Sequence, residues 1–163
     1  MLGISHMKIA LGISLFTANP DFIVGSVIGS LLPDIDKQTT YLGRYNFFLK
    51  SKAVKKVIQH RGVTHSIFGT LVTIAILKLL FNRTSLMGIS FGIVTHLIAD
   101  SFTPMGIQLW WLPNQSESER RKKRVVLGRI KTGGLLEWVI SNSIFLAGLV
   151  AGLVTFVRSI VYV

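Results

Sequence analysis

Apolar residues gather in four blocks along the chain. The blocks span Ile9–Leu32, Ile67–Phe81, Leu86–Phe102 and Leu135–Val157. A helix that crosses a membrane needs about 20 residues, and the last block reaches that length by itself. The blocks lack the polar stripe that a surface helix of a soluble protein presents to water. The pattern therefore favours membrane helices over the alternative, core helices of a soluble bundle.

Two polar interruptions predict how the blocks fold back on themselves. Asn19-Pro20-Asp21 breaks the first block, and proline after asparagine is typical of a turn. We therefore expect a re-entrant or short-helix N-terminal hairpin. Asn82-Arg83-Thr84 joins the second and third blocks into a central helical hairpin. The predicted fold is all-α, a multi-pass membrane helical bundle with a C-terminal transmembrane helix, forming a single domain over residues 1–163.

Basic residues are concentrated between the apolar blocks. The chain has 163 residues, 15% of them charged, and a formal net charge of +11, whereas soluble domains carry about 25% charged residues. Most basic side chains lie in residues 37–61 and 120–131, so the positive-inside rule puts 37–64 and 113–134 in the cytoplasm. The hairpin tip and the C-terminus are then on the far side. We expect these segments to lie near the lipid bilayer and its anionic headgroups, and no nucleic acid to bind.

Histidine and aspartate side chains lie in or beside the apolar blocks, where ionisable groups are costly and therefore indicate functional sites. Each has a structural alternative when taken alone. His96 and Asp100 are one helical turn apart and could hydrogen-bond to each other, and Asp34 with Asp36 could form a turn after Pro33. The full set of candidate ligands is His6, Asp34, Asp36, His60, His65, His96 and Asp100.

The two predicted hairpins bring these side chains to one level. His6 lies as far before the first turn as Asp34 lies after it. His65 lies 18 residues before Arg83 at the second tip and Asp100 lies 17 after it, which at about 1.5 Å per residue gives the same depth. The topology puts both levels near the cytoplasmic face.

Imidazole and carboxylate groups at one level suit a divalent metal. Zn²⁺ fits this donor set best, and Mn²⁺ or Fe²⁺ also accept it, whereas Mg²⁺ and Ca²⁺ usually take oxygen alone. The chain has no cysteine, which excludes thiolate ligands. The set is large enough for one or two ions. A bound metal lowers the pKa of its water to about 7 and polarises a phosphoryl oxygen, so the site predicts hydrolysis.

Glu137 stands at the predicted start of the last helix. It is either a further ligand or a general base, or a carboxylate that the helix dipole favours at that position.

The chain resembles the YdjM family of LexA-regulated, inner-membrane-associated proteins, which are assigned as metal-dependent hydrolases. The resemblance covers roughly residues 3–140. It rests on His6, Leu32-Pro33-Asp34-Ile35-Asp36, His60-Arg61-Gly62-Val63-Thr64-His65-Ser66, His96-Leu97-Ile98-Ala99-Asp100, Thr103-Pro104-Met105-Gly106, Trp110-Trp111-Leu112-Pro113, and Gly128-Arg129-Ile130 with Glu137. It implies a multi-pass protein of the bacterial inner membrane, distantly similar to zinc-dependent phospholipases C and P1 nucleases. The implied ligands are His6, Asp34, Asp36, His65, His96 and Asp100, with His60 close by.

We therefore expect a membrane-bound, metal-dependent hydrolase that acts on phosphoester or lipid-type substrates. Asp36 or Glu137 would accept a proton from the attacking water, and Arg61 would neutralise charge on the substrate. The alternative is a non-enzymatic membrane transporter or partner-binding protein with a polar His/Asp relay. A relay would spread its groups across the bilayer, whereas a hydrolytic site gathers them in one layer.

Overall fold

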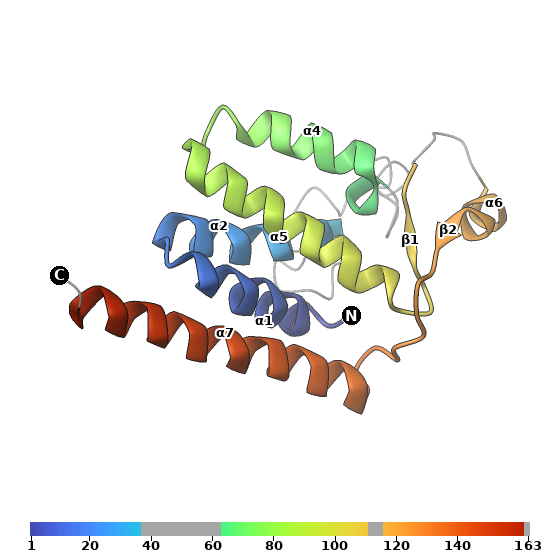
Figure 1. The fold of residues 1–163 in the computed structure, drawn as a ribbon. Helices are drawn as coiled ribbons and strands as arrows, with labels where there is room; N and C mark the ends of the chain where they lie inside the picture. The colour runs from blue at the N-terminus through green and yellow to red at the C-terminus, as the bar shows by residue number, and fades with distance from the viewer. Residues whose placement is uncertain (37–62, 111–115, 162–163) are drawn as a thin grey trace.

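A computed structural model describes residues 1–36, 63–110 and 116–161 of the chain. These residues are mostly helical (Figure 1). The elements in chain order are α1 (Gly3–Ser14), α2 (Pro20–Leu31), α4 (Ile67–Leu77), α5 (Arg83–Ser101), β1 (Ile107–Gln108), α6 (Glu117–Lys122), β2 (Arg124–Val125) and α7 (Leu135–Val161). Short 3-10 turns cover Leu15–Thr17, Pro33–Asp36 and Val63–His65.

Polar side chains begin the helices at the turns that the sequence predicts. Asn19 caps α2, Asn82 caps α5 and Ser66 caps α4, each by accepting a backbone N–H bond of 2.8–3.0 Å. The first apolar block is therefore two short helices, and α4 and α5 form the central hairpin. The helix of the second block ends at Leu77, before the predicted end of that block.

Helices α2 and α5 run side by side because glycine lets their backbones approach closely. A Cβ atom at Gly29 would lie 2.0 Å from the carbonyl oxygen of Ile89, and one at Gly92 would lie 2.1 Å from that of Ser26. No side chain fits at either distance. The pairing is parallel, so the C-terminal ends of α2 and α5 lie at the same end of the molecule.

Helices α1 and α7 also pack in parallel. The backbone N–H of Leu2 donates to Glu137 at 2.7 Å, and two turns or more further on a Cβ atom at Gly148 would lie 1.9 Å from the carbonyl oxygen of Gly12. The start of α7 therefore lies beside the start of α1.

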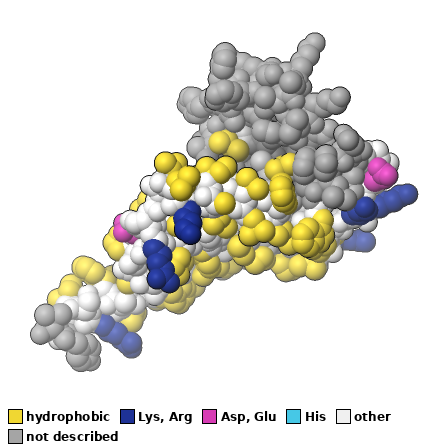
Figure 2. All heavy atoms as spheres, turned by 90° about the horizontal axis from the view of Figure 1, so that it is seen from above, with side chains coloured by type: hydrophobic (Ala, Val, Ile, Leu, Met, Phe, Trp, Pro, Cys, Tyr) yellow, Lys and Arg dark blue, Asp and Glu magenta, His cyan; other side chains and the backbone are white. Residues whose placement is uncertain are grey.

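Helix α7 is the one helix of the described residues that is long and apolar enough to cross a membrane. Its 27 residues span about 40 Å, more than the roughly 30 Å of a bilayer's hydrocarbon core. Many of its apolar side chains are exposed. In Figure 2 hydrophobic side chains are spread over the described part of the face seen from above. The multi-pass arrangement stays a prediction.

A small sheet adds to the predicted all-α fold. Strands β1 and β2 pair antiparallel, with Ile107 opposite Val125 and Gln108 opposite Arg124. The backbone N–H of Ile67 donates to the carbonyl oxygen of Leu109 at 3.0 Å, so this pair lies against the start of α4. Strands of two residues are too short to give an alternating pattern, which explains why the sequence does not predict them. Helix α6 lies in the basic segment 113–134, for which the apolar pattern predicts no helix.

Candidate metal centre

Five candidate ligands meet at one end of the molecule. Their positions are the start of α1 for His6, the turn after α2 for Asp34, the turn before α4 for His65, and the last turns of α5 for His96 and Asp100. Each of the five is exposed by 9% or less. The two predicted hairpins therefore converge as the residue counts indicate.

The donor atoms lie at separations that suit one coordination shell. Nε2 of His65 is 3.3 Å from Nε2 of His96 and 3.6 Å from Oδ2 of Asp100. Nε2 of His96 is 3.8 Å from the same Oδ2 atom, and Oδ1 of Asp34 is 3.8 Å from Nε2 of His65. Two ligands of a tetrahedral zinc ion are about 3.3–3.6 Å apart, given metal–ligand lengths of about 2.0–2.2 Å. The longer donor–donor distances need to shorten only slightly for these atoms to coordinate one ion.

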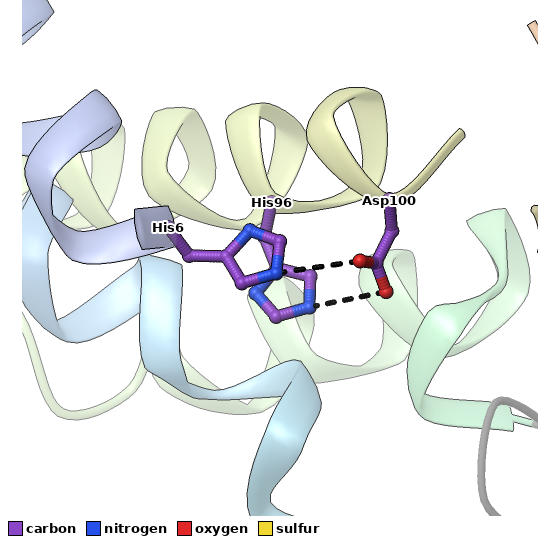
Figure 3. Close-up of side chains that lie close together, drawn as sticks. All are labelled: His6, His96 and Asp100. Atoms are coloured by element: carbon purple, nitrogen blue, oxygen red, sulfur yellow. Dashed lines mark ion pairs between the residues drawn. The ribbon is translucent and has the colours of Figure 1, made fainter. Parts of the chain in front are cut away.

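His6 extends the cluster on its other side. Its ring stacks on that of His96, with centroids 3.6 Å apart and an interplanar angle of 13°. Figure 3 shows its Nε2 atom facing Asp100, 3.3 Å from Oδ1. Both ring nitrogens of His6 are buried; Nε2 has only this ion pair with Asp100, and Nδ1 has no hydrogen-bond partner among the described residues. A buried nitrogen of this kind is costly unless something binds it, which fits a metal ligand.

The cluster contains two overlapping groups whose donor atoms all lie within 4.8 Å of one another. One group is His6, His96 and Asp100, and the other is Asp34, His65 and His96. The geometry of both groups is able to hold a metal ion.

Neighbouring oxygens orient two of the imidazoles. Nδ1 of His96 is 2.6 Å from the carbonyl oxygen of Ser30. Because a carbonyl oxygen only accepts hydrogen bonds, Nδ1 must carry the proton and donate. Nδ1 of His65 is 3.0 Å from Oγ1 of Thr64. In both rings Nε2 is left facing the cluster, as is usual for metal-binding histidines. Sequence reasoning missed both partners. The Thr64-His65 dipeptide is a weak signal for one, and a backbone carbonyl gives none for the other.

Asp100 faces both sides of the cluster. Its Oδ2 atom is directed to His65 and His96, while Oδ1 faces His6 and accepts a hydrogen bond from the Met1 amino group. A buried carboxylate needs such positive or hydrogen-bonding partners to offset the loss of water. Thr103 fixes the end of the helix by donating its hydroxyl to the carbonyl oxygen of Asp100 at 2.7 Å.

Glu137 is buried but lies outside both His/Asp groups. Its Oε1 atom accepts the Leu2 N–H at 2.7 Å, and its Oε2 atom accepts the Gly133 N–H at 3.0 Å. Both oxygens therefore hold backbone where α7 begins. A role for Glu137 as general base stays a prediction.

The other candidates lie outside the described side chains. His60 and Arg61 are not among the described residues, and of Asp36 only the backbone is described, in the turn after α2. Their predicted roles stay predictions.

Comparison with known proteins identifies the family of this chain. A family model described as YdjM inner membrane protein matches residues 1–162. The chain is 30% identical over 95 residues to the inner membrane protein YdjM of Escherichia coli (strain K12) and of Shigella flexneri, covering 55% of this chain and 48% of each relative. It is 35% identical over 83 residues to the uncharacterized protein YvsG of Bacillus subtilis (strain 168), covering 50% of this chain and 51% of that one.

The chain spans about half the length of the curated relatives it matches. No solved structure matches it. The match of the family model over nearly the whole chain shows that this protein belongs to the YdjM inner membrane protein family.

Proposed function

We propose that this protein is a membrane-bound, metal-dependent hydrolase that cleaves phosphoester substrates of the lipid type at the cytoplasmic face of the inner membrane. The observation that carries the proposal is the convergence of buried His and Asp donors from α1, α5, the turn after α2 and the turn before α4. Membership of an inner membrane protein family supports the location. The basic segments that flank the apolar helices support the orientation.

The metal ligands are His65, His96, Asp34 and Asp100, with His6 on the far side of Asp100. His96 belongs to both groups of donors, and its Nδ1 atom is used by Ser30, so it offers a single nitrogen. These residues therefore suit one ion, and Zn²⁺ fits their mixture of nitrogen and oxygen. When bound, such an ion ionises a water molecule near neutral pH and polarises the phosphoryl oxygen.

The remaining roles belong to residues near the ligands. Asp36 follows Asp34 in the same turn, and we assign it as the acceptor of the proton from the attacking water. Glu137 is the weaker choice because both of its oxygens accept backbone hydrogen bonds. Arg61, four residues before His65, neutralises charge on the phosphoryl group.

The distribution of the ionisable groups favours a hydrolase over a transporter. A proton or ion relay needs groups at successive depths of the bilayer. In this protein each described group of His and Asp donors lies within 4.8 Å, and no further histidine is described along α5 or α7. The compact cluster suits chemistry at one place.

Elemental analysis of the full chain, purified in detergent, tests the proposal. We expect close to one zinc, manganese or iron ion per chain, and its loss in His96→Ala and Asp100→Asn. Asp21→Asn is the matched control, because Asp21 is an exposed aspartate in the first turn of α2, far from the cluster. Full metal content in Asp100→Asn would contradict the assignment.

A further inference from the structure

Two apolar grooves lie on either side of one ridge of α5. The first is bounded by α4, α5 and the β1–β2 pair, has a volume of about 480 Å³, and is lined by residues such as Leu71, Ile74 and Leu97. The second is bounded by α1, α5 and α7, has a volume of about 360 Å³, and is lined by residues such as Ile9, Phe102 and Ile144. Ile98 lines both grooves.

Ile98 forms the ridge between the grooves and is 53% exposed. It lies two residues from His96 and two from Asp100. With about 3.6 residues per turn, its side chain is therefore on roughly the opposite side of α5 from both ligands. The ridge thus lies on the far side of α5 from His96 and Asp100, and its second groove comes nearest to the metal centre at Met1, which lines that groove and donates to Asp100.

The walls of both grooves are hydrocarbon, and no hydroxyl group in them is available to hydrogen-bond a ligand. Three hydroxyl residues contribute to their walls, and each hydroxyl donates to a carbonyl of its own helix. Thr70 donates to Ser66 at 3.0 Å, Ser101 to Ile98 at 2.6 Å, and Thr95 to Gly92 at 2.9 Å. A polar ligand would find no partner here, so hydrocarbon is the chemistry that fits.

The position of α7 indicates where that hydrocarbon comes from. Ile140 and Ile144 of α7 line the second groove, and α7 is the helix whose length and composition suit a membrane. A groove walled by a membrane helix faces acyl chains. A water molecule occupies roughly 30 Å³ in the liquid, and a methylene group is of similar size. Each groove therefore has room for on the order of ten methylene groups.

Two basic side chains lie near the end of the ridge. The segment after β2 is held against the end of α5, because the backbone N–H of Leu127 donates to Ser101 at 2.7 Å and that of Ile130 donates to Phe102 at 2.9 Å. Arg129 and Lys131 flank Ile130, and both are exposed. They put positive charge where a headgroup would lie if its two chains ran along the grooves.

From these observations we infer that the ridge is a binding site for an anionic lipid with two hydrocarbon chains. The chains straddle Ile98, one in each groove, and the phosphate of the headgroup lies against Arg129 and Lys131. The site goes beyond the proposed hydrolase function and does not depend on it, since it lies across α5 from the ligands.

Native mass spectrometry of the full chain in detergent, titrated with defined lipids, tests the inference. We expect phosphatidylglycerol, which has two chains and a negative charge, to bind most tightly. Phosphatidylcholine lacks the net charge and should bind about 25-fold more weakly, since each basic group near a surface contributes about fivefold. Lysophosphatidylglycerol fills a single groove and should bind at least tenfold more weakly. Equal binding of the one-chain lipid would overturn the two-chain site.

Two sets of variants separate the ridge from general membrane affinity. Ile98→Trp blocks both grooves and should weaken the binding of both two-chain lipids at least tenfold. Met87→Trp is its control, because Met87 is 55% exposed on the same helix but lines neither groove. Arg129→Gln with Lys131→Gln should abolish the preference for phosphatidylglycerol, while Lys78→Gln with Arg83→Gln at the hairpin tip should keep it.

Three further results would contradict the site. One is wild-type lipid binding by Ile98→Trp. Another is an equal loss of preference in both pairs of charge variants. The third is a lipid-free dimer that Ile98→Trp dissociates, which would show that a second copy covers the ridge. The metal content of Ile98→Trp should equal that of the wild type, so a failure of this site is distinguishable from a failure of the metal centre.

Discussion

The direction in which an imidazole nitrogen points depends on the partner of the other nitrogen. In His65 the Nδ1 atom is 3.0 Å from Oγ1 of Thr64, and Nε2 faces His96 and the two aspartates. If Thr64 orients this ring for a metal, removing its hydroxyl must lower the affinity of the protein for the metal.

We therefore expect Thr64→Val to bind metal about 10- to 100-fold more weakly than the wild type, as is typical when a partner of a ligand is removed. Thr64→Ser keeps the hydroxyl and should retain affinity. Competition with a chelator of known affinity measures both. Equal affinities of the wild type and Thr64→Val would mean that Thr64 does not position His65.

Glu137 illustrates how one carboxylate can hold backbone from distant parts of the chain. It joins Leu2 at the start of α1 to Gly133 before α7. Glu137→Gln keeps one acceptor oxygen but turns an amide donor toward the other N–H. A buried N–H left without an acceptor costs about 1–3 kcal/mol, which for this size of chain lowers the Tm by about 2–12 °C.

Thermal unfolding in detergent checks this expectation, and metal analysis accompanies it. We expect Glu137→Gln to be less stable and to keep its metal. Ser143→Ala, at an exposed position of α7, leaves these bonds intact and is the control. Unchanged stability together with a loss of hydrolysis would instead favour the general-base role of Glu137.

At the scale of helices, close backbone contact between α2 and α5 sets the distance between the ligands they carry. Gly29→Ala would put a Cβ atom against the carbonyl oxygen of Ile89, where the gap is 2.0 Å. The helices must then separate, which costs about 1–3 kcal/mol or more and moves Asp34 away from His96 and Asp100 of α5. We expect both a lower Tm and weaker metal binding.

Gly152→Ala is the matched control on α7. The nearest atom to a Cβ there is 3.6 Å away, an ordinary contact, and alanine is a better helix former than glycine by up to about 1 kcal/mol. Its Tm should equal or exceed that of the wild type. A Gly29→Ala variant that behaves like Gly152→Ala would show that α2 and α5 are not held at the distance described.

The helices and their hairpins could be predicted from the sequence, because asparagine caps and apolar blocks are local signals. Equal or nearly equal arms around Pro20 and Arg83 also predict that His6 and Asp34, and His65 and Asp100, reach one level. The β1–β2 pair and α6 could not be predicted, since neither has a long enough periodic pattern. The contact of His96 with the Ser30 carbonyl follows from the α2–α5 packing and leaves no mark in the sequence.

At the scale of the whole molecule, the ends of the helices are gathered at two opposite ends of the structure. The tip of the α4–α5 hairpin and the C-terminal end of α7 lie at one end in Figure 1, and the β1–β2 pair with α6 lies at the other. The basic run of α6 and β2 is therefore remote from Arg83 at the hairpin tip. The charges predict that the end with the metal centre is on the cytoplasmic side, and this orientation stays a prediction.

The natural absence of cysteine allows this topology to be measured directly. Asn82 at the hairpin tip and Ser118 in α6 are both exposed, so Asn82→Cys and Ser118→Cys each supply one accessible thiol. In cells whose outer membrane has been opened, a membrane-impermeant maleimide should label Asn82→Cys at once. It should label Ser118→Cys only after the inner membrane is also permeabilised. The wild-type chain, labelled under both conditions, gives the background. The reverse pattern would put the metal centre on the periplasmic side, and labelling of both thiols in intact inner membranes would mean that the α4–α5 hairpin does not cross the bilayer.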